Sequence, residues 1–217
     1  MIMKLDLRLT MVASLVRPGK PLADIGTDHA FVPVFLILND IIPSAYACDI
    51  KVGPLDNAKK TIDEYDLNDK VTPILSDGLI EVPHDVNDFV IAGMGGELIA
   101  KILSDSPWVE EVGNHFVLQP QTHAESLRQY LFGAGYEILK EDVVLDKRHL
   151  YLAMEVVYTG KVMGHEKCDY YLGELKNSNS IYKNNYIEYV ISRLDVQYKA
   201  TKDEDIRDLI DKLKEAL

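Results

Sequence analysis

The chain has 217 residues, of which 47% are apolar and 27% are charged, which is enough for one good hydrophobic core with room for an appendage. No apolar run approaches the roughly 20 residues that a membrane-spanning helix needs, and the N-terminus lacks the pattern of a signal peptide. The net charge of -12 argues against diffuse nucleic-acid binding, which depends on neutralising phosphates, but a local basic patch could still serve.

The two cysteines, Cys48 and Cys168, do not have the spacing of a metal site. We interpret both as small thiols that are buried or lie at the surface. We therefore expect a protein of the reducing cytoplasm, with no metal and no membrane association.

Residues 4–17 place apolar side chains at helical spacing, and Pro18-Gly19 ends the expected helix. Arg8 lies within this helix. It is either a solvated arginine on a packing helix or a group that reaches a ligand carboxylate or phosphate.

The stretch Leu22 to Ala30 predicts a strand over about 21–25, a glycine turn and a following helix. This is the opening of a nucleotide-binding α/β unit, in which ligands lie beyond the carboxyl ends of the strands. Gly26 lets backbone approach a ligand, whereas Asp24 and Asp28 make the turn negative. Such a turn suits a cationic sulfonium with an amino group better than a pyrophosphate. The missing G-x-G-x-x-G leaves a nicotinamide oxidoreductase as a distant alternative.

Later strand ends carry similar residues. Asp49 follows a strand at 45–48, about 20 residues beyond the first glycine turn, where an acid is expected to accept from ribose hydroxyls. Asp77-Gly78 follows a strand at 71–75, and Leu79 offers an apolar face to an adenine. Gly93 to Gly96 follow a strand at 88–92. Each could be an ordinary turn, but their clustering at one sheet edge favours a ligand site.

The second half completes the sheet. A strand at 116–118 leads into Gln119-Pro120-Gln121 and a helix at 123–134, and strands at 136–145 and 150–158 suit a hairpin. The pattern predicts an α/β fold, a doubly wound parallel sheet with an antiparallel strand near its edge. That arrangement is typical of Rossmann-like class I methyltransferases, an analogy at the level of the fold.

Composition changes after Gly160. Helical spacing at 187–198 and again at 206–217 predicts a C-terminal helical hairpin, with Thr201 to Glu204 as a capping box for its second helix. We expect a methyltransferase domain over residues 1–160 and a coiled-coil-like tail over 161–217.

Five strings occur in order along the chain: DIGTDHA, CDIKVGPL, SDGL, IAGMGG and LQPQ. Together they resemble the bacterial tRNA (adenine-22, N1)-methyltransferase family over about residues 5–158. The resemblance implies a cytoplasmic enzyme of tRNA modification that binds S-adenosyl-L-methionine and methylates N1 of an adenine in tRNA. Two departures stand out: LQPQ replaces the expected LQPN, and GMGG lies where many amino-methylating relatives carry Asn/Asp-Pro-Pro-aromatic.

The resemblance also implies site residues. The expected cofactor-binding set is Asp24, Gly26, Thr27, Asp28, Asp49, Ile50, Asp77, Gly78, Leu79, Gly93, Met94 and Gly95. The expected substrate-binding set is Arg8, Gly96, Gln119 and Pro120. Asp28 is our candidate for the group that stabilises positive charge on the methylated adenine, and His29 is the second choice.

Two other functions stay open: a methyltransferase that acts on a small molecule or protein, which the acidic charge favours, and a non-catalytic cofactor-binding module. We expect a monomer or weak homodimer. Phosphate contacts would have to come from local patches, although each cation is more often a solvated surface charge. The candidates are Lys4, Arg8, Arg17, Lys147, Arg148, Lys183, Arg193 and Lys199, with Tyr182, Tyr186 and Tyr189 as possible stacking side chains.

Overall fold

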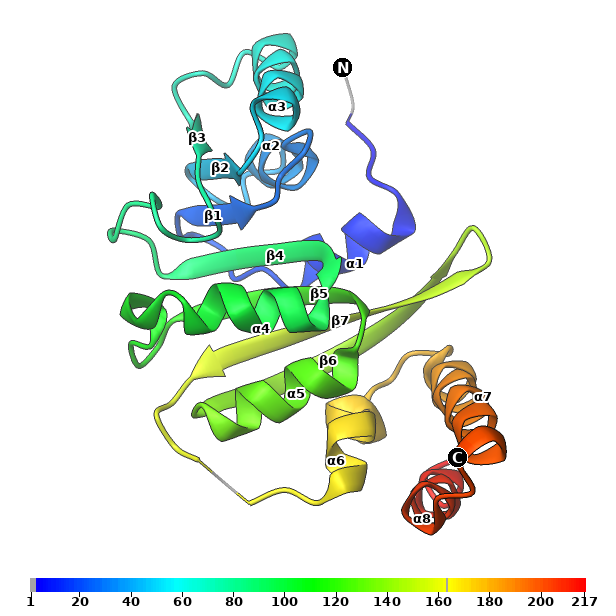
Figure 1. Ribbon diagram of the computed structural model, residues 1–217. Coiled ribbons are helices and arrows are strands. Elements are labelled where there is room, and N and C mark those ends of the chain that lie inside the picture. Colours follow the sequence, from blue (N-terminus) through cyan, green and yellow to red (C-terminus); the bar gives the residue numbers. More distant parts are fainter. Residues whose placement is uncertain (1–2, 163) are drawn as a thin grey trace.

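The computed structural model describes residues 3–162 and 164–217, and within them the chain forms a seven-stranded sheet with helices on both faces (Figure 1). The strand order is β3-β2-β1-β4-β5-β7-β6. Strands β1 to β5 are parallel, and β7 is antiparallel to both β5 and β6. This confirms the predicted doubly wound sheet with an antiparallel strand near its edge. The strands are β1 (Leu22–Ile25), β2 (Ala45–Asp49), β3 (Val71–Leu75), β4 (Asp88–Gly95), β5 (His115–Thr122), β6 (Tyr136–Asp146) and β7 (His149–Tyr158).

Alternating side chains divide the core between the two faces of the sheet, because successive residues of a strand point to opposite sides. Phe89 and Ile91 of β4 pack in one apolar cluster with α4 and α5, whereas Val90 packs in the other with α1, α2 and α3. The helices are α1 (Leu7–Ser14), α2 (Phe31–Leu38), α3 (Val52–Glu64), α4 (Gly96–Ser104), α5 (Ala124–Gly133), α6 (Lys167–Leu172), α7 (Lys183–Thr201) and α8 (Glu204–Lys214), with short 3-10 turns at η1 (Pro107–Val109) and η2 (Gly173–Asn177).

Several predicted boundaries were wrong. Strand β4 runs through the glycines to Gly95, because its ladder with β5 continues past a register shift at Met94. Helix α1 is shorter than predicted, since Asp6 caps it by accepting from the Leu9 N–H at 2.7 Å. The predicted capping box at Thr201 is also wrong: α7 extends through Thr201, and Asp203 caps α8 instead. Helix α6 was not predicted.

The C-terminal segment contacts the sheet domain through α6, η2 and the start of α7. Leu175 and Tyr186 belong to the main apolar core, and Ser180 Oγ donates to the Val143 carbonyl at 2.6 Å. Helices α7 and α8 pack on each other through a small cluster of their own, which includes Leu194 and Leu209. The division of the chain at residue 160 stays a prediction. Every helix in the described ranges is too short or too polar to cross a bilayer.

Candidate functional site

A cavity of about 350 Å³ opens at the carboxyl edge of the parallel strands, between α1, the β1–α2 turn and the end of β4. Parallel strands deliver their C-terminal loops to one edge, which is why residues from distant parts of the chain meet here. Its walls contain seven residues of the predicted sites. The lining residues are Asp6, Arg8, Leu9, Asp24, Gly26, Thr27, Asp28, His29, Phe31, Val32, Ala92, Gly93 and Gln121.

Gly26 shapes the floor of this cavity. It has φ +75°, and its N–H and that of Thr27 donate to the Cys48 carbonyl at 2.8 and 2.9 Å. The end of the Met94 side chain occupies the space that a Cβ on Gly26 would fill. The turn therefore favours glycine for its left-handed backbone, and a Cβ at this position would also displace the end of the Met94 side chain.

Asp24 is buried beneath the same turn, and its Oδ2 accepts from Thr27 Oγ1 at 2.6 Å. Burial raises the pKa of Asp24 from 3.8 to about 6, with a smaller upward contribution from Asp49 and an opposing one from the Thr27 hydroxyl. The site thus holds a carboxylate that a cationic ligand would favour in its ionised form.

Asp28 and His29 lie at the mouth of the cavity and face water. The side chains are 64% and 43% exposed, and His29 Nε2 lies 3.6 Å from Asp28 Oδ2. The His29 ring stacks on Phe31 with centroids 4.9 Å apart. Both candidate catalytic groups can therefore meet a substrate that enters from solvent.

The second and third strand ends adjoin this site along the same edge. Asp49 Oδ1 accepts from the Lys51 N–H at 2.9 Å, and the Asp49 carbonyl accepts from the Ser76 N–H at 2.9 Å. The Asp77 side chain is exposed. These contacts hold the β2 and β3 loops together and leave the second oxygen of Asp49 free of contacts from the described residues.

Leu79 was expected to offer an apolar face to an adenine, but it is fully buried in the main core. Ile50, which was predicted, and Ile80, which was not, are 57% and 59% exposed. Gly78 has φ +60°, so the chain turns there instead of continuing the strand. The side chains of Leu79 and Ile80 therefore point the opposite way from the directions that a continued strand would give them. The sequence offered no local signal for Ile80, because its exposure depends on this turn.

Gln119 organises the end of β4. Its Oε1 accepts from Arg8 Nη1 at 3.0 Å, from the Gly93 N–H at 3.2 Å and from Gln121 Nε2 at 3.3 Å. Its own amide nitrogen donates to the Pro120 carbonyl at 3.0 Å. Gln119 and Pro120 are both buried, so Arg8 and Gln121, not these two residues, form the cavity wall on this side.

Two further glycines of the GMGG string have distinct surroundings. Gly93 has φ +80° and lines the cavity. Gly96 begins α4, and a Cβ there would collide with the backbone carbonyl of His123. Close packing of α4 on the loop after β5 is therefore sufficient to explain Gly96.

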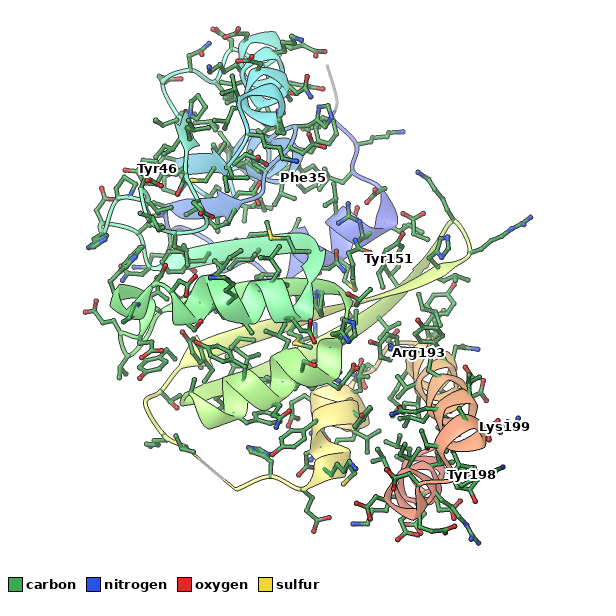
Figure 2. The ribbon with its side chains drawn as sticks, in the orientation of Figure 1. Phe35, Tyr46, Tyr151, Arg193, Tyr198 and Lys199 are labelled. Atoms are coloured by element: carbon green, nitrogen blue, oxygen red, sulfur yellow. The ribbon has the colours of Figure 1, made fainter. Side chains whose placement is uncertain are left out.

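Tyr151 was not predicted as a site residue, yet it lies against Arg8, whose guanidinium carbon is 5.8 Å from the centre of its ring. Figure 2 shows Tyr151 on the β6–β7 hairpin beside α1. More than 140 positions separate the two residues in sequence, so no local pattern could pair them.

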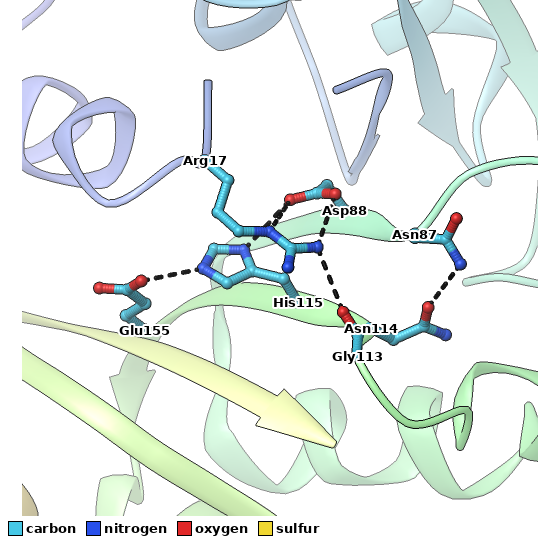
Figure 3. A network of polar contacts seen from close by, with 7 residues as sticks. All are labelled: Arg17, Asn87, Asp88, Gly113, Asn114, His115 and Glu155. Atoms are coloured by element: carbon cyan, nitrogen blue, oxygen red, sulfur yellow. Dashed lines mark hydrogen bonds and ion pairs between the residues drawn. The ribbon is translucent and has the colours of Figure 1, made fainter. Parts of the chain in front are cut away.

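Arg17 was a candidate for phosphate contact, but it is occupied at the opposite edge of the sheet (Figure 3). Its guanidinium donates to both carboxylate oxygens of buried Asp88, at 2.7 and 2.8 Å. His115 lies between Asp88 and Glu155, with its ring nitrogens 3.4 and 3.1 Å from their oxygens. This network fastens the end of α1 to β4, and we assign Arg17 a structural role.

Comparison with known proteins identifies the family. A family model described as a methyltransferase domain matches residues 5–154. The chain is 36% identical over 146 residues to the tRNA (adenine(22)-N(1))-methyltransferase of Bacillus subtilis (strain 168), an alignment that covers 67% of this chain and 61% of the relative. The chain belongs to the bacterial tRNA (adenine-22, N1)-methyltransferase family.

Other members support this placement. A putative tRNA methyltransferase of Mycoplasma pneumoniae is 32% identical over 154 residues, with 69% of this chain and 70% of that protein covered. The structure of Streptococcus pneumoniae Sp1610, a putative tRNA (m1A22) methyltransferase in complex with S-adenosyl-L-methionine, is similar with a TM-score of 0.87. Its sequence is 29% identical, and the match covers 99% of this chain and 100% of that one. The Rossmann-like methyltransferase fold is thus confirmed. The curated B. subtilis relative is aligned over less than two thirds of its own length.

Proposed function

We propose that the protein transfers a methyl group from S-adenosyl-L-methionine to N1 of an adenosine in tRNA, at adenine 22. The observation that carries the proposal is the cavity at the carboxyl edge, where buried Asp24 lies under the Gly26 turn and exposed Asp28 stands at the mouth. The activity named for the B. subtilis relative supports the choice of reaction.

The residues of the site fit this cofactor. Its amino group and sulfonium are cationic, and the carboxylates of Asp24 and Asp28 suit them, whereas Arg8, which also lines the cavity, suits the carboxylate. The second oxygen of Asp49 would accept from a ribose hydroxyl. Exposed Ile50, with Asp77 and Gly78, would flank the adenine. When bound, the cofactor supplies an activated methyl group.

The acceptor needs positioning more than activation, because N1 of adenine already carries a lone pair. Methylation at N1 places positive charge on the ring and makes its exocyclic amine more acidic. A carboxylate at the mouth of the cavity would stabilise that charge and could accept a proton. Asp28 has the required exposure and lies beside the Gly26 turn. His29 lies next to it as the second choice.

A methyl-transfer assay tests the reaction. Purified protein is incubated with methyl-labelled S-adenosyl-L-methionine and unmodified tRNA, and the RNA is digested to nucleosides. Label in 1-methyladenosine is expected, and a tRNA with adenine 22 replaced should take up none. If calorimetry shows that the protein binds the cofactor but no RNA becomes labelled, the proposal is rejected. That result would favour a small-molecule or protein acceptor, or the non-catalytic module.

The role of Asp28 needs a separate test. Asp28→Asn keeps the size of the side chain and removes its charge. We expect the single-turnover rate to fall by about 10²-fold or more, in the range of general acid–base effects, with a smaller change in cofactor affinity. An unchanged rate would exclude the catalytic role, and equal losses would reassign Asp28 to cofactor binding. His29→Gln is the matched variant beside it.

Action as a monomer or weak homodimer in the cytoplasm belongs to the same proposal. Light scattering during size-exclusion chromatography, with and without tRNA, would measure the oligomeric state.

A further inference from the structure

The β6–β7 hairpin extends beyond the edge of the sheet that carries the cavity. Strand β5 pairs with β7 only over Met154 to Val157, whereas β6 pairs with β7 as far as Asp146 and His149. Five residue pairs therefore lie beyond the ladder with β5, a reach of about 17 Å at the usual rise of a strand. Figure 1 shows the hairpin passing α1 and projecting beyond the ends of β4 and β5.

One face of the hairpin connects the cavity to the tip. Tyr151 and His149 are two positions apart on β7 and share a face, and their rings are 6.3 Å apart. Tyr151 also lies beneath the guanidinium of Arg8, which lines the cavity. A row of cationic and aromatic side chains therefore leads outward from the site. We call the side chains of Arg8, Lys147, Arg148, His149 and Tyr151 the hairpin strip.

The tip of the hairpin presents two cations on an unfavourable backbone. Lys147 and Arg148 form the two-residue turn, and both have positive φ, 45° and 74°. A two-residue turn with positive φ at both positions strongly favours Asn-Gly, because residues with larger side chains rarely adopt the left-handed backbone conformation. A Lys-Arg pair at these positions lowers the stability of the turn, and the fold does not require these two residues there.

These two cations are also available for binding. Both side chains are exposed, and neither forms an ion pair or hydrogen bond with the residues that the structure describes. By contrast, α8 directs Arg207, Lys212 and Lys214 to carboxylates of the chain itself. Because the chain has a net charge of -12, it can bind phosphates only through a local patch of unpaired cations. The hairpin strip provides such a patch next to the cavity.

We propose that the hairpin strip is a docking surface for tRNA, in which Lys147 and Arg148 contact backbone phosphates and His149 and Tyr151 offer rings to bases near the target adenosine. This inference rests on the proposed function. Phosphate contacts fix register and orientation without reading sequence, whereas stacking on aromatic rings holds unpaired bases. The strip would thus hold the tRNA while its adenosine enters the cavity.

The test exploits the opposite effects of one double variant on stability and binding. Lys147→Asn with Arg148→Gly installs the favoured turn and removes both cations. Its melting temperature should equal or exceed that of the parent, and cofactor affinity should not change. Affinity for an unmodified tRNA transcript should fall about tenfold, and the slope of log affinity against log salt should become shallower by roughly 1.5 to 2.

The matched control removes two exposed lysines from α3, Lys59→Gln with Lys60→Gln, which changes net charge equally but far from the hairpin. Its tRNA affinity should fall by less than about twofold. Equal losses in both variants, or an unchanged salt slope in the hairpin variant, would overturn the docking surface. Binding is measured without methyl transfer, so the proposed function is tested separately: a parent protein that leaves tRNA unmethylated contradicts the reaction, not the surface.

Discussion

Arg8 Nη1 donates to Gln119 Oε1 at 3.0 Å, so a hydrogen bond joins the first helix to the end of β5 across 111 positions of sequence. At the other end of the sheet, Arg17 just beyond the same helix pairs with Asp88. Two arginines therefore hold helix α1 to the sheet, Arg8 at the carboxyl edge and Arg17 at the opposite edge. The first contact borders the candidate site, and the second is structural.

Gln119→Leu tests whether this residue positions the site. The variant removes the acceptor shared by Arg8, Gly93 and Gln121 and replaces the amide with an apolar side chain of similar size. We expect the single-turnover methylation rate to fall by about 10- to 100-fold, because misplacement of a supporting group by about 1 Å can cost that much. Cofactor affinity should change much less.

A double-mutant cycle distinguishes positioning from loss of stability. If Gln119 acts through Arg8, Gln119→Leu and Arg8→Ala together should slow the reaction little more than Arg8→Ala alone. Gln119→Glu retains an acceptor and should recover part of the rate. Additive effects of the two substitutions, with a lower melting temperature as the main result, would leave Gln119 a packing residue.

Asp24 predicts opposite pH dependences for stability and cofactor binding. Burial raises its pKa in the folded state from 3.8 to about 6, so the folded protein holds this proton more tightly than the unfolded chain. Its contribution to stability is therefore fully present below pH about 4 and is lost as the pH rises through about 6. Asp24→Asn should raise the free energy of unfolding at pH 8 by up to about 3 kcal/mol, and this gain should vanish by pH 4.

Cofactor binding should have the reverse trend, because the cationic ligand needs the ionised carboxylate. Affinity of the parent protein should fall as the pH drops below about 6, up to tenfold for each pH unit, whereas Asp24→Asn should bind weakly at every pH. Calorimetry between pH 5 and 8 measures this. A parent affinity that is independent of pH would remove Asp24 from the cationic end of the cofactor.

Arg128 is expected to anchor the C-terminal segment. It is buried, donates from Nε to Glu141 Oε1 at 2.8 Å, and donates from Nη1 to the carbonyls of Tyr170 and Tyr171 at the end of α6. Arg128→Met would leave Glu141 buried without its counter-charge and should cost about 3 to 5 kcal/mol. Chemical denaturation measures this loss.

Two further measurements test whether this loss of stability comes from the buried ion pair. Burial raises the pKa of Glu141 and Arg128 opposes this rise, so the cost of Arg128→Met should shrink at acid pH as Glu141 takes up a proton. Lys199→Met breaks the exposed pair with Asp195 and should cost less than about 1 kcal/mol. Similar losses in the two variants would show that the buried pair does not anchor the segment.

Gly96→Ala tests whether α4 must approach the loop after β5 closely. The new Cβ would collide with backbone atoms of His123, and overpacking of this kind usually costs about 1 to 3 kcal/mol. Gly133→Ala on α5 is the control, because the space around Gly133 is open and alanine favours a helix. Thermal melts should therefore move in opposite directions. A stable Gly96→Ala protein with reduced tRNA binding would instead support substrate contact at Gly96.

The sequence by itself predicted the order of the strands, most of the helices and the edge of the sheet at which the candidate site lies. Apolar alternation and glycine turns are local signals, and parallel strands necessarily bring Asp24, Asp49 and Asp77 to one edge of the sheet. The resemblance of the strings to a family then supplied the reaction, which spacing alone could not. Segment boundaries were less accurate where glycines continued a strand, as at Gly93 to Gly95.

Tertiary structure decided which side chains face the cavity and which are used elsewhere. Leu79 points into the core, whereas Ile80 faces solvent. Arg17 forms an ion pair with Asp88. Arg8 contacts Gln119 and Tyr151. A repeating pattern in sequence shows the face of an element on which a residue lies, but not the distant residue that meets it. Those pairings depend on how helix, strand and hairpin pack together, because the contacts that define them join residues 71 or more positions apart in the chain.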